Sequence, residues 1–154
     1  MDLGDLIKPD GVIAHLQAPS KKVALSELAA RAAELLKRDK GPIFEALWQR
    51  ERLSSTGIGK GIAIPHCQLS QLTGMFGMFA RLDHAIDFEA MDEQPVDLVF
   101  LLLSPEAAGA DHLKALARIS RLMRDPPTLE KLRATKSRAA IYSILTEPMA
   151  SNAA

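Results

Sequence analysis

One histidine of this chain stands directly behind a glycine-rich turn and a short apolar run. The run covers residues 62–64 and predicts a short strand that enters the core. Pro65 ends the run, because proline fixes φ and cannot donate to a sheet ladder, and it leaves His66 at the strand end. A neutral imidazole is a nucleophile near physiological pH, so His66 is a candidate phosphoryl acceptor. The alternative is a histidine that only packs after a strand.

The turn in front of this strand has glycine at every second position: Gly57, Gly59 and Gly61. Glycine lets the backbone approach a ligand closely, and successive exposed amide groups bind an anion. The spacing differs from the dinucleotide motif Gly-x-Gly-x-x-Gly, and no Gly-Lys-Ser/Thr follows that would make a nucleotide P-loop. We expect a phosphate-binding loop in which the Thr56 hydroxyl donates to the phosphoryl group, unless Thr56 is an ordinary loop residue.

The whole segment from Ser55 to His66 resembles the active-site segment of the IIA domains of the bacterial phosphotransferase system, fructose/mannitol class. The similarity continues in residues 44–51, in residues 92–100 and at His112, and spans roughly residues 10–147. Within that class the chain is most similar to the nitrogen-regulatory branch. The resemblance implies an α/β fold in which a central mixed β-sheet is sandwiched between helices. It implies one domain over residues 1–147, and we expect a flexible tail over residues 148–154.

The same resemblance assigns the site residues. It implies that His66 receives a phosphoryl group from a histidine-phosphorylated carrier of the HPr type, without a metal or other cofactor. His112 would stabilise the phosphohistidine, and Arg50 would supply positive charge to the phosphoryl oxygens. Each has a plainer alternative, since His112 lies in the predicted first turn of a helix and Arg50 in the last turn of another, where a cation is favourable anyway. Two positions depart from the family, which usually has glycine at Cys67 and commonly asparagine at Lys60.

Three functions are compatible with these residues. The first is a regulatory phosphocarrier whose targets, by resemblance, would be proteins such as potassium-transport regulators or sensor kinases. The second is a IIA protein that passes phosphate to a IIB domain for fructose- or mannitol-type uptake. The third is a binding module that keeps the fold without being phosphorylated. The unusual Cys67 keeps the third alternative open, whereas His66, His112 and Arg50 together favour the first two.

Composition limits the partners further. Nineteen basic and nineteen acidic residues balance, so no overall field favours nucleic acid or an anionic membrane. The single cysteine excludes an internal disulfide and is typical of a reducing cytoplasm. The N-terminal residues lack the apolar core of a signal peptide, and residues 98–103 are too short to span a bilayer. We therefore expect a soluble cytoplasmic protein that neither binds nucleic acid nor inserts into a membrane.

Helices and strands alternate along the chain. Apolar residues at three- and four-residue spacing predict helices. Runs in which both the odd and the even positions are apolar predict strands that are buried on both faces. Gly41 is expected to close the first helix, Asp111 to cap the third, and His84 to lie in a polar turn, whereas His15 falls in the first strand. The predicted strands cover residues 11–16, 62–67, 75–82 and 96–103, and the predicted helices cover residues 23–38, 42–52, 111–124, 126–133 and 136–146.

Overall fold

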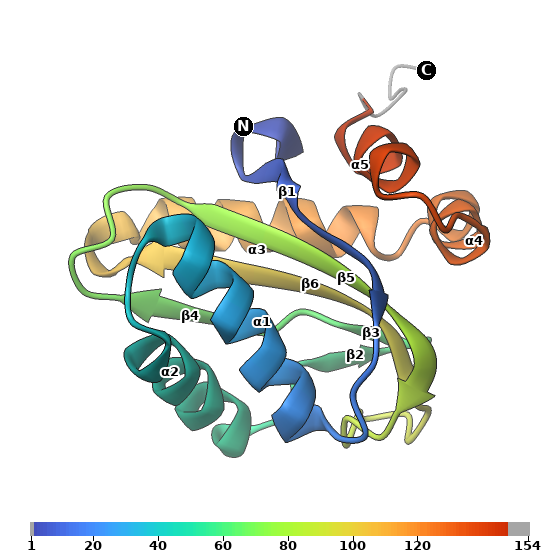
Figure 1. The fold of residues 1–154 in the computed structure, drawn as a ribbon, viewed down its shortest axis with the longest axis horizontal. Coiled ribbons are helices and arrows are strands. Elements are labelled where there is room, and N and C mark those ends of the chain that lie inside the picture. Colours follow the sequence, from blue (N-terminus) through green and yellow to red (C-terminus); the bar gives the residue numbers. More distant parts are fainter. Residues whose placement is uncertain (1, 148–154) are drawn as a thin grey trace.

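Two apolar runs of the sequence form neighbouring strands at the centre of a mixed sheet. In the computed structural model, which describes residues 2–147, these strands are β5 (Phe76–Ile86) and β6 (Val96–Pro105). They pair antiparallel, and β6 is buried from Leu98 to Ser104. Strands with two apolar faces need cover on both, and helices lie on both sides of the sheet (Figure 1).

The sheet has six strands, of which four are shorter or peripheral. These are β1 (Ile7–Leu16), β2 (Gly57–Gly59), β3 (Ile62–Ala63) and β4 (His66–Leu69). The order is β1-β5-β6-β3-β2, and β4 also pairs with β6. β1 runs parallel to β5, β3 and β4 run parallel to β6, and β2 forms an antiparallel pair with β3.

The helices divide into two layers (Figure 1). One layer holds α1 (Lys21–Leu36) and α2 (Lys40–Leu53). The other layer holds α3 (Ala110–Leu122), α4 (Pro126–Ala134) and α5 (Arg138–Thr146). Two single-turn helices are η1 (Leu3–Asp5) and η2 (Glu106–Ala108). Successive residues of β6 alternate between two cores. Leu101 and Leu103 pack with α1 and α2, whereas Leu102 packs with α3, α4 and α5.

The predicted fold class, a mixed sheet between helices, is confirmed. One predicted strand is divided, since residues 62–67 form β3 and the start of β4 with Ile64 and Pro65 between them. Both strands keep one register on β6, because Ala63 pairs with Val99 and His66 with Leu102. Proline has no N–H group for the ladder, which explains the gap between the two short strands.

Several predicted boundaries need correction. The first helix ends at Leu36 with Lys37 in the left-handed conformation, so Gly41 lies inside α2 and closes nothing. The third helix begins at Ala110, and Asp111 lies in its first turn with no cap bond. His84 belongs to β5, which continues four residues beyond the predicted end, because β5 pairs with β6 again at Ile86 after a register shift that follows Arg81. The predicted tail, residues 148–154, lies outside the described residues, and the predicted division at residue 147 stays a prediction.

Candidate active site

His66 is the first residue of β4, and its ring turns back toward the residue before Pro65. Its Nδ1 atom lies 2.7 Å from the carbonyl oxygen of Ile64. A carbonyl oxygen can only accept, so Nδ1 carries the ring proton and donates it. Nε2 therefore keeps its lone pair and is the nucleophilic nitrogen of a neutral His66.

The strand break that divides β3 from β4 creates this contact. Pro65 has no N–H group to donate, although its carbonyl oxygen accepts from the Leu102 N–H at 2.9 Å, and the Ile64 N–H donates to the Thr56 carbonyl oxygen at 3.0 Å. His66 then pairs with Leu102 on β6, and paired residues of a ladder lie on the same face. Since Leu102 belongs to the core under α3, the His66 ring lies on the face that α3 covers.

His112 reaches the same place from the other direction. It lies in the first turn of α3, and its ring centroid is 5.6 Å from that of His66, with the two planes inclined at 52°. Its Nδ1 atom is 2.6 Å from the hydroxyl oxygen of Ser104 on β6. The structure therefore brings together the two histidines that were predicted to share a site.

Both rings favour the neutral form. Burial is the largest cause that lowers the pKa of His66 below its usual 6.5, and the positive charges of Arg50 and His112 lower it further. The bond to Ile64 and the Glu51 carboxylate act in the opposite direction, but the net pKa shift is downward. Burial also lowers the pKa of His112. A neutral His66 has the lone pair that a phosphoryl acceptor needs.

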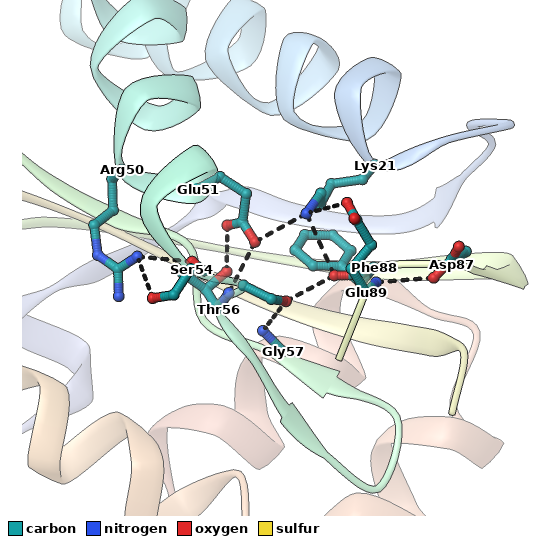
Figure 2. A network of polar contacts seen from close by, with 10 residues as sticks. Lys21, Arg50, Glu51, Ser54, Thr56, Gly57, Asp87, Phe88 and Glu89 are labelled. Atoms are coloured by element: carbon teal, nitrogen blue, oxygen red, sulfur yellow. Dashed lines mark hydrogen bonds and ion pairs between the residues drawn. The ribbon is translucent and has the colours of Figure 1, made fainter. Parts of the chain in front are cut away.

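Arg50 lies in the last turn of α2. Its Nη1 donates to the Ser54 carbonyl oxygen at 2.9 Å, so Arg50 caps the C-terminus of its own helix (Figure 2). Its positive charge also acts on His66, where it lowers the pKa. Arg50 therefore caps its helix, as the plainer alternative predicts, and its positive charge also acts on the candidate acceptor His66.

Thr56 has a different partner from the one that the sequence predicts. Its hydroxyl donates to Glu51 Oε1 at 2.6 Å, and its backbone N–H donates to Glu51 Oε2 at 2.8 Å (Figure 2). A hydroxyl has one proton to give, so the predicted donation from Thr56 to a phosphoryl group is not what this structure shows. Thr56, which is buried, instead fixes the backbone that leads into β2.

The same carboxylate holds the two helices of its layer together. Lys21 Nζ lies 3.4 Å from Glu51 Oε2 and 2.9 Å from Glu89 Oε1, and the Lys21 and Glu51 side chains are only 10% and 1% exposed. Lys21 also donates to the Phe88 carbonyl oxygen. The buried charges are thus paired with each other, and the start of α1 is tied to the end of α2 (Figure 2).

The three predicted phosphate-loop glycines lie in the β2–β3 hairpin, and packing explains each of them. Gly57 lies where a Cβ would come within 2.7 Å of Ala90. Gly59 and Gly61 have φ values of +100° and +83°, and a Cβ at Gly61 would lie 2.9 Å from an Asp97 carboxylate oxygen. The backbone N–H between them, of Lys60, binds the Asp92 carboxylate at 2.8 Å. Phosphate binding by these glycines stays a prediction, because the hairpin accounts for them without a phosphate.

The two departures from the family pattern, Cys67 and Lys60, have different local environments. Cys67 lies in β4 and packs in the core under α1 and α2, on the opposite face from His66. Burial raises the pKa of its thiol to about 12, so it stays protonated and unreactive at neutral pH. Lys60 has a φ of +58°, a conformation that asparagine adopts more readily than lysine.

Comparisons with known proteins show which family this chain resembles. Residues 5–147 match the family "Phosphoenolpyruvate-dependent sugar phosphotransferase system, EIIA 2". The chain belongs to this family. It is 57% identical over 153 residues to a nitrogen regulatory protein of Bradyrhizobium diazoefficiens, covering 99% of this chain and 100% of that protein. A nitrogen regulatory protein of Pseudomonas aeruginosa is 39% identical over 146 residues, covering 94% and 95% of the two chains.

A solved structure gives the same result. The crystal structure of nitrogen regulatory protein IIA-Ntr from Neisseria meningitidis superposes with a TM-score of 0.88 at 30% identity, covering 94% of this chain and 99% of that one. The predicted membership of the EIIA 2 family and the predicted likeness to its nitrogen-regulatory branch are confirmed. Members of this family act as phosphocarriers, which confirms the predicted type of function.

Sequence reasoning missed three groups of this EIIA 2 site. The Ile64 carbonyl oxygen, which sets the tautomer of His66, has no sequence signal. Glu51 does have a sequence signal. It follows the buried residues Ile43 and Leu47 at four-residue intervals, so its side chain is expected to point inward. Ser104 has a weak sequence signal, because it is the single hydroxyl residue at the end of the apolar run of β6.

Residues 2–147 contain no group of three or more histidine, cysteine or acidic side chains placed to hold a metal ion. Over the same range, no helix combines the length and the apolar composition that crossing a membrane requires.

Proposed function

We propose that His66 accepts a phosphoryl group on Nε2 from an HPr-type carrier and that the phosphorylated state regulates partner proteins. The observation that carries the proposal is the bond from Nδ1 to the Ile64 carbonyl oxygen, which leaves the Nε2 lone pair free in a ring that favours the neutral form. The protein would work as a phosphoryl carrier in the cytoplasm, and in that sense as a transferase.

The transfer needs no proton movement at His66. The Nε2 lone pair forms a bond to phosphorus while the phosphorus–nitrogen bond of the donor's phosphohistidine breaks and returns the electron pair to that ring. The Nδ1 proton stays on its bond to Ile64 throughout. Such a transfer depends mainly on positioning and on charge stabilisation. In this proposal Arg50, whose positive charge acts on His66, supplies that charge, and His112, whose ring centroid lies 5.6 Å from that of His66, contacts the transferred group.

A regulatory role follows from the charge that phosphorylation adds. A phosphoryl group brings nearly two negative charges at neutral pH, and it would bring them to a surface where large apolar side chains are exposed. Leu53, at the end of α2, is 82% exposed, and Leu113, next to His112, is 67% exposed. A partner that packs on these leucines would sense the added charge, because charge complementarity strongly affects docking. Regulatory targets of the kind named above, potassium-transport regulators or sensor kinases, stay predictions.

The test is phosphorylation in vitro. The purified protein is incubated with phosphoenolpyruvate, Enzyme I and an HPr-type carrier, and its intact mass is measured. We expect one acid-labile phosphoryl group on the wild type and on a His84→Ala control, and none on His66→Ala. A wild type that stays unmodified with several active carriers would contradict the proposal and favour the non-phosphorylated binding module.

A sugar-transport role is the second candidate, and it is favoured by the family to which the chain belongs, a sugar phosphotransferase system. The chemistry at His66 would be the same, so only the acceptor distinguishes the two. The phosphorylated protein is mixed with a IIB domain of the fructose or mannitol type. Rapid transfer to that domain would favour uptake, whereas a stable phosphoprotein that changes the activity of a regulatory target would favour regulation.

A further inference from the structure

Ser104 places a hydroxyl in the buried end of β6, directly beside the candidate site. Ser104 is fully buried, and so are the two residues before it on the strand, Leu102 and Leu103. The hydroxyl oxygen lies 2.6 Å from His112 Nδ1. Within the part of the chain that the structure describes, this is the only hydrogen bond of the Ser104 side chain.

This contact determines which nitrogen of His112 carries the proton. If Nδ1 donated to Ser104, the serine proton would be buried without an acceptor among residues 2–147, which is unfavourable. If Ser104 donates to Nδ1, both groups are satisfied. A neutral imidazole has one proton, so His112 then carries it on Nε2.

The sheet register explains why Ser104 can do this. His66 pairs with Leu102, and Ser104 follows two residues later on β6, so both side chains lie on the face that α3 covers. The chain turns through η2 and starts α3 at Ala110, which brings His112 back over Ser104. One nitrogen of the His112 ring is thereby held by Ser104, and the centroid of this ring lies 5.6 Å from the centroid of the His66 ring.

We infer that Ser104 is a positioning residue that holds His112 in the Nε2–H tautomer, so that His112 offers a proton to the phosphoryl group that His66 carries. The two rings are then set in opposite states. The Ile64 carbonyl oxygen accepts from His66 and leaves a lone pair at its Nε2, whereas the Ser104 hydroxyl donates to His112 and leaves a proton at its Nε2. The functional half of the inference, that His112 offers a proton to the phosphoryl group, rests on the proposed function. The assignment of the His112 tautomer does not depend on it.

The tautomer is measured without any phosphoryl transfer. Long-range ¹H–¹⁵N correlation spectra of ¹⁵N-histidine-labelled protein, recorded above the titration of the rings, distinguish protonated from unprotonated ring nitrogens. We expect His112 with the proton on Nε2 in the wild type and in Ser104→Thr, and a mixture of tautomers in Ser104→Ala. The His66 pattern should stay unchanged in all three. A proton on Nδ1 of His112 in the wild type, or an unchanged tautomer in Ser104→Ala, would overturn the inference.

The second measurement is the rate of phosphorylation by the HPr-type carrier. We expect Ser104→Ala to be slower by about tenfold, as for one weakened hydrogen bond, and Ser104→Thr to restore the rate. A full rate in Ser104→Ala despite a changed tautomer would refute the functional half. A wild type that is never phosphorylated would refute the proposed function, while the spectra would still decide whether Ser104 sets the tautomer.

Discussion

At the scale of single residues, the site depends on which atom each histidine has as its partner. His66 and His112 are the same residue type, yet one Nδ1 faces a carbonyl oxygen and the other a hydroxyl. The sequence predicted both histidines, because the motif around them is specific. It could not predict their tautomers, since Ile64 and Ser104 reach the rings only through the strand break after β3 and the register of β4 on β6.

Arg50 provides the first prediction at this scale. Its positive charge disfavours the protonated form of His66, so replacing it with alanine should raise the pKa of His66 toward its ordinary value. A ¹H–¹⁵N titration of the ring measures this directly. Arg52→Ala, two residues along the same helix, is the matched control and should leave the His66 titration as it is. An unchanged or lower pKa in Arg50→Ala would show that the guanidinium does not act on His66.

The rate of phosphorylation should fall in the same variant. Removing one preorganised charge-stabilising group from a transfer site typically costs on the order of 100-fold in rate. The second measurement is therefore the transfer rate from the HPr-type carrier at a pH where His66 is neutral in both proteins. Equal rates for Arg50→Ala and the wild type would restrict Arg50 to its role as a helix cap.

At the scale of elements, the site depends on connections that periodicity does not reveal. Both-face burial predicted β5 and β6 and hence the two helix layers. The glycine segment was predicted as a phosphate loop, but it pairs with β3 and packs against Ala90, Asp92 and Asp97, which lie far away in the sequence. The sequence could not reveal this hairpin, because an open glycine loop and a tight glycine hairpin have the same local composition, and phosphate binding by these glycines stays a prediction.

Gly61 tests this interpretation of the hairpin. Alanine at Gly61 would have to adopt a φ of +83° with its Cβ 2.5 Å from Arg133 Nη2. We expect Gly61→Ala to lower the free energy of unfolding by about 2 kcal/mol, measured by urea denaturation. Gly41→Ala, in an open helical position, should instead stabilise the protein by up to about 1 kcal/mol. Equal stability of Gly61→Ala and the wild type would mean that the hairpin is not held as described.

Glu51 tests how α1, α2 and the start of β2 are held together. Glu51→Gln leaves the buried Lys21 ammonium without its buried partner, so we expect a loss of about 3–5 kcal/mol in the free energy of unfolding. Adding Lys21→Met should recover part of that loss, because it removes the ammonium group that keeps only the exposed Glu89 carboxylate as an ion-pair partner. Glu45→Gln, on the exposed side of the same helix, is the control and should change little. Strictly additive losses in the double variant would contradict a coupled pair.

At the scale of the whole molecule, the resemblance predicted the family and the type of function from a segment of twelve residues. The balanced charge and the apolar strands were compatible with many α/β proteins, and composition alone would not have separated them. What the motif could not provide is the register of β4 on β6, which places His66 on one face of the sheet and Cys67 on the other. That alternation also explains why a cysteine is accepted directly behind the candidate acceptor.

The folded protein should lose stability as both histidines become protonated. Folding lowers the pKa of His66 and of His112 below 6.5, so the unfolded chain takes up protons first as the pH falls. Stability is therefore complete above about pH 6.5 and decreases as the pH drops toward the folded-state pKa values. Urea denaturation at pH 7.5 and pH 5.5 measures this, and His66→Gln should show a smaller difference. A protein that becomes more stable at the lower pH would contradict the direction of both shifts.

The most direct test of the account is the identity of the phosphorylated atom. Protein labelled with ¹⁵N-histidine is phosphorylated through phosphoenolpyruvate, Enzyme I and the HPr-type carrier, and its ring nitrogens are assigned by long-range ¹H–¹⁵N correlation. We expect phosphorus on Nε2 of His66, with Nδ1 still protonated and bound to the Ile64 carbonyl oxygen. Phosphorus on Nδ1 of His66, or on any other histidine, would contradict it.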